Sequence, residues 1–360
     1  MVLGGIAGLA VAGGGLTWLA LSQKSGSIIV SHSSATSTSV VQPTQPTTSA
    51  SPTSVNTPSS PTTTPMGTRF YNYHGHSLYI YGVTWASLDG GRIASASLDT
   101  SVQVWNASTG DRYFMYNHSK AVNDVKASYD KMHIASAGED GIVQVRDATT
   151  GGFIFSYNHH NGAVNTVEWQ PGNSTRVVTA SSDRTVQIWD ATNGAPIQAY
   201  RGHADIVWAA GWSPNGQYIV SASADGTARV WDATSGTTLT TYTGHSATVR
   251  SVSWSPDGQH IATASDDQTV KVWNAFSGNT LLTYTGHTDR LRTVAWSHDG
   301  SRIVSGSKDA TAQIWHATTG ILIYVYRGHS ATVFDAQWSP DGTRIASGST
   351  DTTVQIWQAT

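Results

Sequence analysis

Three residue types that can catalyse hydrolysis recur at a fixed spacing along this chain. In the stretch from Gly244 to Asn274 they are His245, Thr263 and Asp267. A histidine, a hydroxyl and an aspartate are the components of a hydrolase triad, in which the histidine activates the hydroxyl. The same set occurs seven times, however, whereas a catalytic centre needs it once. We therefore predict that the set is structural and that the protein is not an enzyme.

The set belongs to a repeat of about 42 residues that also carries an anchor residue, usually Trp. The histidines are His76, His118, His160, His203, His245, His287 and His329. The hydroxyl residues are Ser95, Ser136, Thr179, Ser221, Thr263, Ser305 and Ser347. The aspartates are Asp99, Asp140, Asp183, Asp225, Asp267, Asp309 and Asp351. The anchors are Trp105, Arg146, Trp189, Trp231, Trp273, Trp315 and Trp357. A repeat of this length predicts a stacked or circular array of small units.

Each repeat has the pattern of four short antiparallel strands. Alternating or β-prone segments cover residues 249–254, 260–265, 269–273 and 280–284. Turn-forming residues separate them, including Pro256-Asp257-Gly258 and Ser277-Gly278-Asn279. The whole chain contains 14 Trp and 35 Gly, which also favours an all-β, turn-rich architecture.

From residue 69 to the end, the chain resembles the WD40 family, whose repeats begin with Gly-His and end with Trp-Asp. Gly202-His203 and Trp231-Asp232 show both marks intact. The resemblance implies a seven-bladed β-propeller in which each blade is a four-stranded sheet. It also implies that the His, Ser/Thr, Asp and Trp of each blade form a buried hydrogen-bonded network, here called the tetrad. The physical chemistry agrees, because a buried carboxylate is tolerated where imidazole and hydroxyl groups satisfy it.

The two ends of the repeat region predict how the ring closes. The last repeat stops after its third strand, at residues 352–359, whereas residues 68–73 form a strand with no repeat of their own. We expect the strand at 68–73 to complete the last blade, which removes a free sheet edge.

The second repeat departs from the pattern. Arg146 stands at the anchor, Ser128 is assigned to the position of a Trp in the first strand, and no Gly precedes His118. We expect this blade to be the loosest, with Arg146 paired to Asp140 or Glu139.

The composition excludes several classes of function. Among 360 residues there is no cysteine, so disulfides, thiol catalysis and cysteine-ligated zinc are excluded. The formal net charge is −3, which gives no basic field for nucleic acid. No cofactor or metal site is predicted. The pairs His159-His160 and His74–His76 are the unusual histidine groupings, and no further His or carboxylate cluster is expected outside the repeat columns.

The N-terminal part predicts a membrane attachment. Residues 2–21 are uncharged and as a helix would span about 30 Å, so residues 1–24 are assigned to a transmembrane helix or signal anchor. A cleaved signal peptide is the alternative. Residues 25–67, rich in Ser, Thr and Pro, are predicted to be a disordered linker before the propeller at 68–360. We predict a membrane-anchored, extracytoplasmic propeller, with the cytoplasmic face as the alternative.

The resemblance also implies where a partner binds, namely the wide top face around the central channel. The positions that point there carry large aromatic and basic residues in several blades, the types that dominate interaction hot spots. The candidate partner-binding residues are Tyr79, Tyr81, Trp208, Arg250, Arg290, Arg292, Lys308 and Phe334. Arginines beside aromatics suit an acidic protein or peptide.

The leading hypothesis is therefore a monomeric, membrane-tethered scaffold or sensor domain that binds a protein or peptide. Some bacterial proteins of this architecture resemble receptors with a kinase before the membrane helix. This chain has no kinase motif, so the second hypothesis is the extracytoplasmic part of a larger kinase-linked receptor. A propeller hydrolase or lyase is the third, and no residues outside the repeat columns favour it.

Overall fold

The alternating segments of the repeats form strands, as their pattern predicts. The computed structural model describes residues 64–360, which form 28 strands and no helix. No helix in this part of the chain is therefore long and apolar enough to cross a membrane. The predicted membrane segment at 1–24 and the linker as far as residue 63 lie outside the described residues. Residues 65–68 form a turn in which Thr68 N–H donates to the Pro65 carbonyl.

The strands form seven antiparallel four-stranded sheets, one per blade. Within each blade we name the strands a to d, from the channel outward. The a strands are β2 (Ile80–Trp85), β6 (Val122–Ala127), β10 (Val164–Trp169), β14 (Val207–Trp212), β18 (Val249–Trp254), β22 (Leu291–Trp296) and β26 (Val333–Trp338). The b strands are β3 (Arg92–Ser97), β7 (His133–Gly138), β11 (Arg176–Ser181), β15 (Tyr218–Ser223), β19 (His260–Ser265), β23 (Arg302–Ser307) and β27 (Arg344–Ser349).

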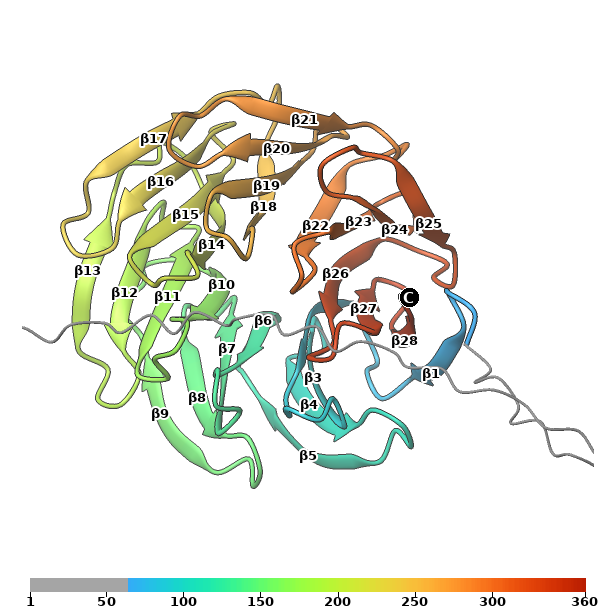
Figure 1. The fold of residues 1–360 in the computed structure, drawn as a ribbon. Coiled ribbons are helices and arrows are strands. Elements are labelled where there is room, and N and C mark those ends of the chain that lie inside the picture. Colours follow the sequence, from blue (N-terminus) through green and yellow to red (C-terminus); the bar gives the residue numbers. More distant parts are fainter. Residues whose placement is uncertain (1–63) are drawn as a thin grey trace, which may run out of the picture. The chain divides into compact units, whose positions relative to one another are not determined.

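The outer two strands complete each blade. The c strands are β4 (Ser101–Asn106), β8 (Val143–Asp147), β12 (Val186–Asp190), β16 (Ala228–Asp232), β20 (Val270–Asn274), β24 (Ala312–His316) and β28 (Val354–Gln358). The d strands are β5 (Arg112–Asn117), β9 (Phe153–Tyr157), β13 (Pro196–Tyr200), β17 (Thr238–Tyr242), β21 (Thr280–Tyr284), β25 (Leu322–Tyr326) and β1 (Arg69–Tyr73). Blades are numbered 1 to 7 from the one that contains β2. Figure 1 shows the ring, with a strands on the inside and d strands on the rim.

The predicted closure of the ring is confirmed. Strand β1 pairs antiparallel with β28 of blade 7, with Tyr73 opposite Val354 and Arg69 opposite Trp357. Two residues before β1 begins, Gly67 N–H donates to the Gln358 carbonyl at 2.7 Å. Blade 7 is therefore built from both ends of the repeat region, beside each other in Figure 1.

The apolar core lies between the blades rather than in the channel. In one cluster, Ile188 and Tyr200 of blade 3 pack with Trp212, Ile219 and Trp231 of blade 4. All six tryptophans at the anchor position are fully buried, at 0 % exposure. Because each large side chain leaves water on contact with the next blade, every blade is stabilised by its two neighbours.

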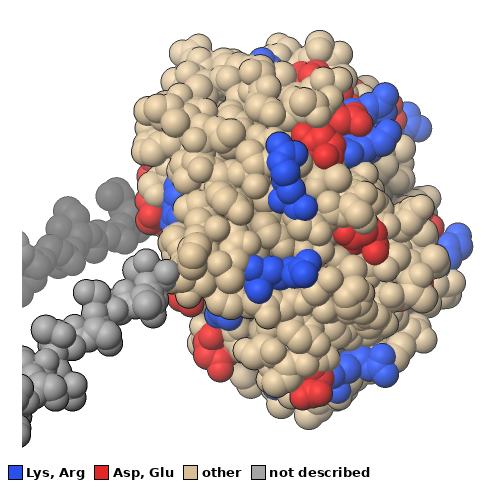
Figure 2. Space-filling model, turned by 90° about the vertical axis from the view of Figure 1, so that its right-hand side faces the viewer, with Lys and Arg blue, Asp and Glu red and all other residues tan. Residues whose placement is uncertain are grey.

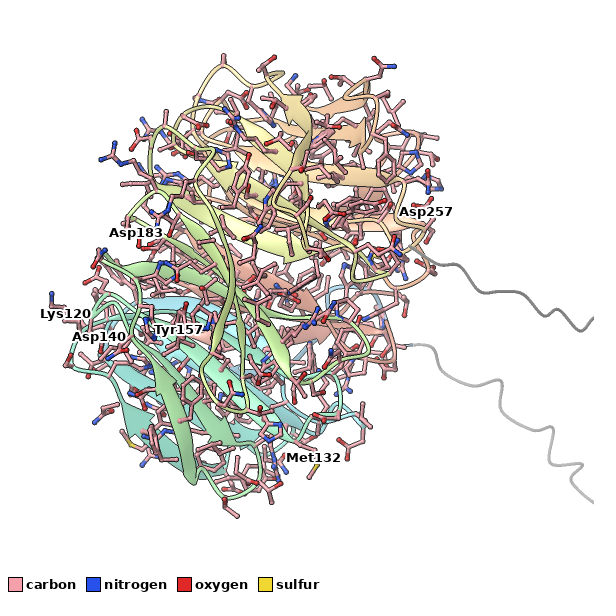
Figure 3. All side chains as sticks on the ribbon, turned by 90° about the vertical axis from the view of Figure 1, so that its left-hand side faces the viewer. Lys120, Met132, Asp140, Tyr157, Asp183 and Asp257 are labelled. Carbon is pink, nitrogen blue, oxygen red and sulfur yellow. The ribbon has the colours of Figure 1, made fainter. Side chains whose placement is uncertain are left out.

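The two faces of the ring carry different turns. In Figure 3, Asp140 and Asp183, from turns between strands b and c, lie on one side together with Lys120. Asp257 and Met132, from turns between strands a and b, lie on the opposite side. The first side is the top face on which the sequence places the candidate binding residues.

Candidate functional site

The tetrad forms a continuous hydrogen-bonded network. In blade 5, His245 Nδ1 lies 2.7 Å from Asp267 Oδ2, and His245 Nε2 lies 2.8 Å from Thr263 Oγ1. We infer that Nδ1 carries the proton, because the carboxylate can only accept, and that the hydroxyl donates to Nε2. A second hydroxyl, Thr269, donates to Asp267 Oδ1 at 2.7 Å. Both carboxylate oxygens are thereby satisfied.

The same contacts recur around the ring. The distances from His Nδ1 to Asp Oδ2 are 2.9 Å for His76–Asp99, His160–Asp183 and His203–Asp225, and 2.8 Å for His287–Asp309 and His329–Asp351. In blade 2 the distance from His118 to Asp140 is longer, at 3.3 Å. All seven hydroxyl residues of the tetrad are completely buried. A substrate in solvent therefore has no access to a hydroxyl nucleophile in these networks, which fits a structural role.

The anchor tryptophans contribute to the network unequally. Trp105, Trp189, Trp315 and Trp357 donate their indole N–H to the tetrad hydroxyl at 3.1 to 3.3 Å. The indole nitrogens of Trp231 and Trp273 are buried without a partner, so the expected donation is absent in blades 4 and 5. Sequence reasoning missed a second contact, in which each anchor tryptophan stacks on a d-strand tyrosine, as Trp273 does on Tyr242 at 4.5 Å.

Hydrogen bonds keep the tetrad carboxylates ionised. Burial alone would raise the pKa of Asp225, but hydrogen bonds from Thr227 and His203 lower it to about 2. Burial lowers the pKa of His203 below its ordinary value, although Asp225 opposes this shift. The pair is therefore a neutral imidazole bound to a carboxylate at neutral pH.

Blade 2 departs from the others, but not as the sequence predicts. Arg146 does not pair with Asp140 or Glu139. Its guanidinium donates to Gln144 and to the Gly151 carbonyl, and it stacks on the Tyr116 ring at 4.3 Å. A planar cation replaces the indole in the stack on tyrosine, because guanidinium packs on aromatic faces as tryptophan does.

A second correction concerns the missing tryptophan of strand a in blade 2. The register of β6 places Ala127, not Ser128, opposite Ile134, where Trp212 in β14 lies opposite Ile219. Ser128 instead forms the turn that follows, donating to Asp130 as Ser213 does to Asn215. The residue that replaces the tryptophan is therefore Ala127, one position before the Ser128 assigned from the sequence.

Five of the eight candidate partner-binding residues form one connected arc at the top of the channel. The guanidinium of Arg250 lies over the Trp208 ring at 4.3 Å and binds Asp266 at 2.7 Å. Arg292 reaches the other oxygen of Asp266 at 3.5 Å and lies 5.4 Å from the Phe334 ring. That ring in turn packs against Tyr81, with centroids 4.8 Å apart. The arc crosses blades 4, 5, 6, 7 and 1.

The other three candidates lie beside the arc and are exposed. Tyr79 is 45 % exposed. Arg290 and Lys308 are adjacent, because Lys308 N–H donates to the Arg290 carbonyl at 2.9 Å. The carboxylate of Asp289 accepts from the Arg290 backbone N–H at 2.7 Å. Sequence reasoning named Asp266 as a top-face position but did not include it among the binding residues, although it holds two arginines.

A charged cluster in the channel was not foreseen. Lys126 Nζ lies 3.3 Å from Asp124 and 3.4 Å from Asp335. Burial would lower the pKa of Lys126, but these two carboxylates raise it above its usual range. The expectation that no carboxylate cluster exists outside the repeat columns is therefore wrong. The signal was present in the a strands, whose third residue is acidic only in β6 and β26.

Two further charged groups belong to this cluster. Burial raises the pKa of Glu168 to about 7, while Lys126 opposes the shift. Lys131 occupies a turn position with φ +60°, where blades 1 and 4 to 7 have glycine. Its ammonium donates to the Trp85 carbonyl at 3.1 Å. These groups lie at the side of the channel where blade 2 lacks its tryptophan.

The paired histidines do not form a cluster of metal ligands. His159 packs against the Tyr157 ring at 4.9 Å, while His160 belongs to the tetrad. Across residues 64–360, no three His, Cys, Asp or Glu side chains gather closely enough to hold a metal ion.

Comparison with known families agrees with this geometry. A family model described as WD domain, G-beta repeat matches the chain at residues 67–106, 111–147, 151–190, 194–232, 236–274, 278–316 and 320–358. The chain belongs to the WD40 family. Each match contains the d strand of one blade and the a, b and c strands of the next, so successive WD40 repeats link the blades into a ring. No curated protein matches the chain.

WD40 propellers are generally protein-interaction scaffolds and are typically non-enzymatic. In this WD40 propeller, the side of the ring in Figure 2 carries separate Lys/Arg and Asp/Glu side chains on a mostly uncharged surface. That side offers no continuous basic field of the kind that binds a nucleic-acid backbone.

Proposed function

We propose that this propeller is a non-enzymatic scaffold or sensor domain that captures a protein or peptide partner on its top face. The observation that carries the proposal is the arc from Trp208 through Arg250 and Arg292 to Phe334, which is made of the side chains that dominate interaction hot spots. Its members hold one another in place before a partner arrives. A preorganised surface of this kind loses little side-chain entropy on binding.

The charge of this face favours an acidic partner. Two of its four cations, Arg290 and Lys308, are exposed and have no ion-pair partner among the described residues, whereas Arg250 and Arg292 share Asp266. Local charge of one sign steers a partner of the opposite sign.

Affinity capture with residues 61–360, which form one compact unit, tests the proposal. We expect the wild-type propeller to retain a partner. A variant carrying Trp208→Ala, Arg250→Gln, Arg292→Gln and Asp266→Asn, in which no carboxylate is left unpaired, should lose it with the melting temperature little changed. The matched control replaces Arg302 and Arg344 by Gln, because these arginines also stack on tryptophans, at 4.8 and 4.9 Å, but follow the turns of the opposite face. Retained capture by the first variant contradicts the site.

We further propose that the propeller is held at a membrane by residues 2–21, on the extracytoplasmic side, through the Ser/Thr/Pro-rich segment. The uncharged run and the composition of that segment support this proposal. Membrane fractionation of the full chain tests attachment, and protease accessibility in intact cells tests the side. The related proposal, a kinase-linked receptor, is tested by searching for a kinase reading frame continuous with this one.

A further inference from the structure

The rim of the ring differs in charge between two sectors. Each of blades 1 to 4 has one carboxylate between the end of its c strand and the end of its d strand: Asp111, Asp147, Asp190 and Asp232. The same stretch of blades 5 to 7, here called the non-acidic rim, contains no Asp or Glu at residues 274–284, 316–326, 358–360 and 64–73. The turn does not require the acid, because the side-chain oxygen of Asn274 accepts turn N–H groups as that of Asp232 does. The fold therefore does not explain why three neighbouring blades lack it.

The non-acidic rim also exposes apolar side chains that the fold does not require. In blade 6, Ile321 and Leu322 are 66 and 46 % exposed, where blade 5 has Asn and Thr at the same register. No other blade has two large aliphatic residues at these positions. Phe153 of blade 2 is large and apolar there too, but it lies under the guanidinium of Arg146 at 5.4 Å. Exposed aliphatic side chains are stabilised only when another apolar surface covers them.

This apolar patch continues into the two neighbouring blades. Strands β21, β25 and β1 follow one another along the rim (Figure 1). They or the turns before them supply four more exposed apolar side chains: Phe276, Leu281, Ile323 and Phe70. Because successive strands of a blade run antiparallel, the turns between strands c and d lie on the side opposite the top face. The patch is therefore separate from the arc of Trp208, Arg250 and Arg292.

Two arginines and the entry point of the chain border the patch. Arg69 and Arg327 are exposed and line a groove together with Tyr324 of β25. Gly67 lines the same groove and leads into β1, so the residues that precede the propeller join it here. An apolar patch bordered by cations and free of carboxylates suits an anionic lipid interface. A second copy of this chain fits less well, because two such patches would bring four arginines together with no carboxylate to pair them.

We propose that the non-acidic rim, centred on Ile321 and Leu322, rests on the surface of a bilayer that contains anionic lipids. The apolar side chains enter the interface, and Arg69 and Arg327 meet the headgroup phosphates. The inference rests on the proposed attachment through residues 2–21 and adds which side of the propeller faces the lipid. Tethering raises the local concentration of lipid, so a patch too small to bind alone suffices. The top face remains free for a partner.

Site-specific fluorescence on the full chain, reconstituted in vesicles, tests this proposal. The chain has no cysteine, so one introduced thiol carries one environment-sensitive label. Ile323→Cys labels the patch, and Ile197→Cys is the matched control, because Ile197 is also in a d strand, with 43 % exposure against 39 %. In vesicles of phosphatidylcholine and phosphatidylglycerol with a spin-labelled lipid, we expect quenching at position 323 and none at position 197. Omitting phosphatidylglycerol should weaken the quenching by about fivefold.

A variant built from the residues of blade 5 tests the centre of the patch. Ile321→Asn with Leu322→Thr should remove the quenching at position 323 and leave the melting temperature and the flotation of the chain with vesicles unchanged. Quenching that survives this replacement overturns the inference. So does a label shift that follows protein density rather than spin-labelled lipid, which identifies a second copy as the occupant.

The two proposals about the membrane fail in different ways. An unquenched label on a chain that floats with the vesicles overturns the inference and leaves the attachment standing. A chain that does not float with the vesicles overturns both.

Discussion

The ammonium of Lys126 lies 3.4 Å from the carboxylate of Asp335, although a whole blade stands between the strands that carry them. Lys126 is in β6 of blade 2 and Asp335 is in β26 of blade 7. Blade 1 contributes Gly82 at the intervening position, so no side chain blocks the contact. The ion pair therefore links blades 2 and 7 on the inner side of the ring. Blade 7 is the blade to which β1 adds the outermost strand.

Replacing Lys126 by Met tests this internal fastening. The variant keeps the length of the side chain but leaves Asp124 and Asp335 beside each other, each with a largely buried carboxylate. We expect the free energy of unfolding to fall by about 3 kcal/mol, because removing one partner of a buried ion pair leaves uncompensated charge. Urea unfolding measures the change, and Lys120→Met, an exposed lysine of the same blade, is the control. Equal unfolding midpoints for the two variants would contradict the role of Lys126.

Gly82 offers a second test, because a methyl group there would meet the same cluster. A Cβ added at Gly82 would lie 3.0 Å from both Cα and Oδ1 of Asp124, tighter than ordinary contact. We expect Gly82→Ala to destabilise the fold by about 1–3 kcal/mol through this overpacking. Gly211 is the matched control, since it is also in an a strand but has open space at its Cβ. Gly211→Ala should leave the melting temperature unchanged or raise it slightly, and a similar loss in both variants would refute the steric explanation.

The fold could be predicted from the sequence because the tetrad residues recur at the same positions in all seven repeats. The strand pattern and the blade number followed from positions that recur in every repeat. The closure of blade 7, predicted for residues 68–73, followed from the two ends of the repeat region. Features that occur once were harder to find. Arg146 was placed in an ion pair because its charge is visible in the sequence, whereas its stacking on Tyr116 depends on the strand that follows it.

The candidate site was predicted in part for the same reason. The positions that face the top of the channel can be counted along each repeat, and five of the named residues meet there. The unequal sharing of Asp266 depends on distances of a few tenths of an ångström, which no spacing encodes. Lys126 and Asp335, 209 residues apart, become neighbours only when the ring is closed.

The tetrads of blades 5 and 2 should differ in their contribution to stability. Asp267 receives bonds of 2.7 Å from both His245 and Thr269, whereas Asp140 lies 3.3 Å from His118. Ile142 stands where Thr269 does, so the hydroxyl bond to Asp140 comes from Ser119 instead, at 3.1 Å. We expect Asp267→Ala to cost about 3 kcal/mol by orphaning its donors, and Asp140→Ala to cost about 1 kcal/mol less.

Chemical denaturation of both tetrad variants measures this difference, with Asp257→Ala in an exposed turn as the control. An equal loss of unfolding free energy in Asp267→Ala and Asp140→Ala would show that the longer distance between His118 and Asp140 does not weaken the blade 2 tetrad.

Glu168 predicts a pH dependence that its neutral replacement should remove. Burial raises its pKa from 4.5 to about 7, with Lys126 opposing the shift, so the folded chain binds more protons than the unfolded chain between these values. The contribution of Glu168 to stability is therefore fully present below about pH 4.5 and is lost as the pH rises towards 7.

Glu168→Gln mimics the protonated carboxyl at every pH. We expect its free energy of unfolding to match that of the wild type near pH 4 and to exceed it by roughly 3 kcal/mol near pH 8. Denaturant unfolding across this range measures the difference, with the exposed Glu139→Gln as control. A difference that stays constant with pH, or that grows towards acid, would mean that protonation of Glu168 does not stabilise the fold.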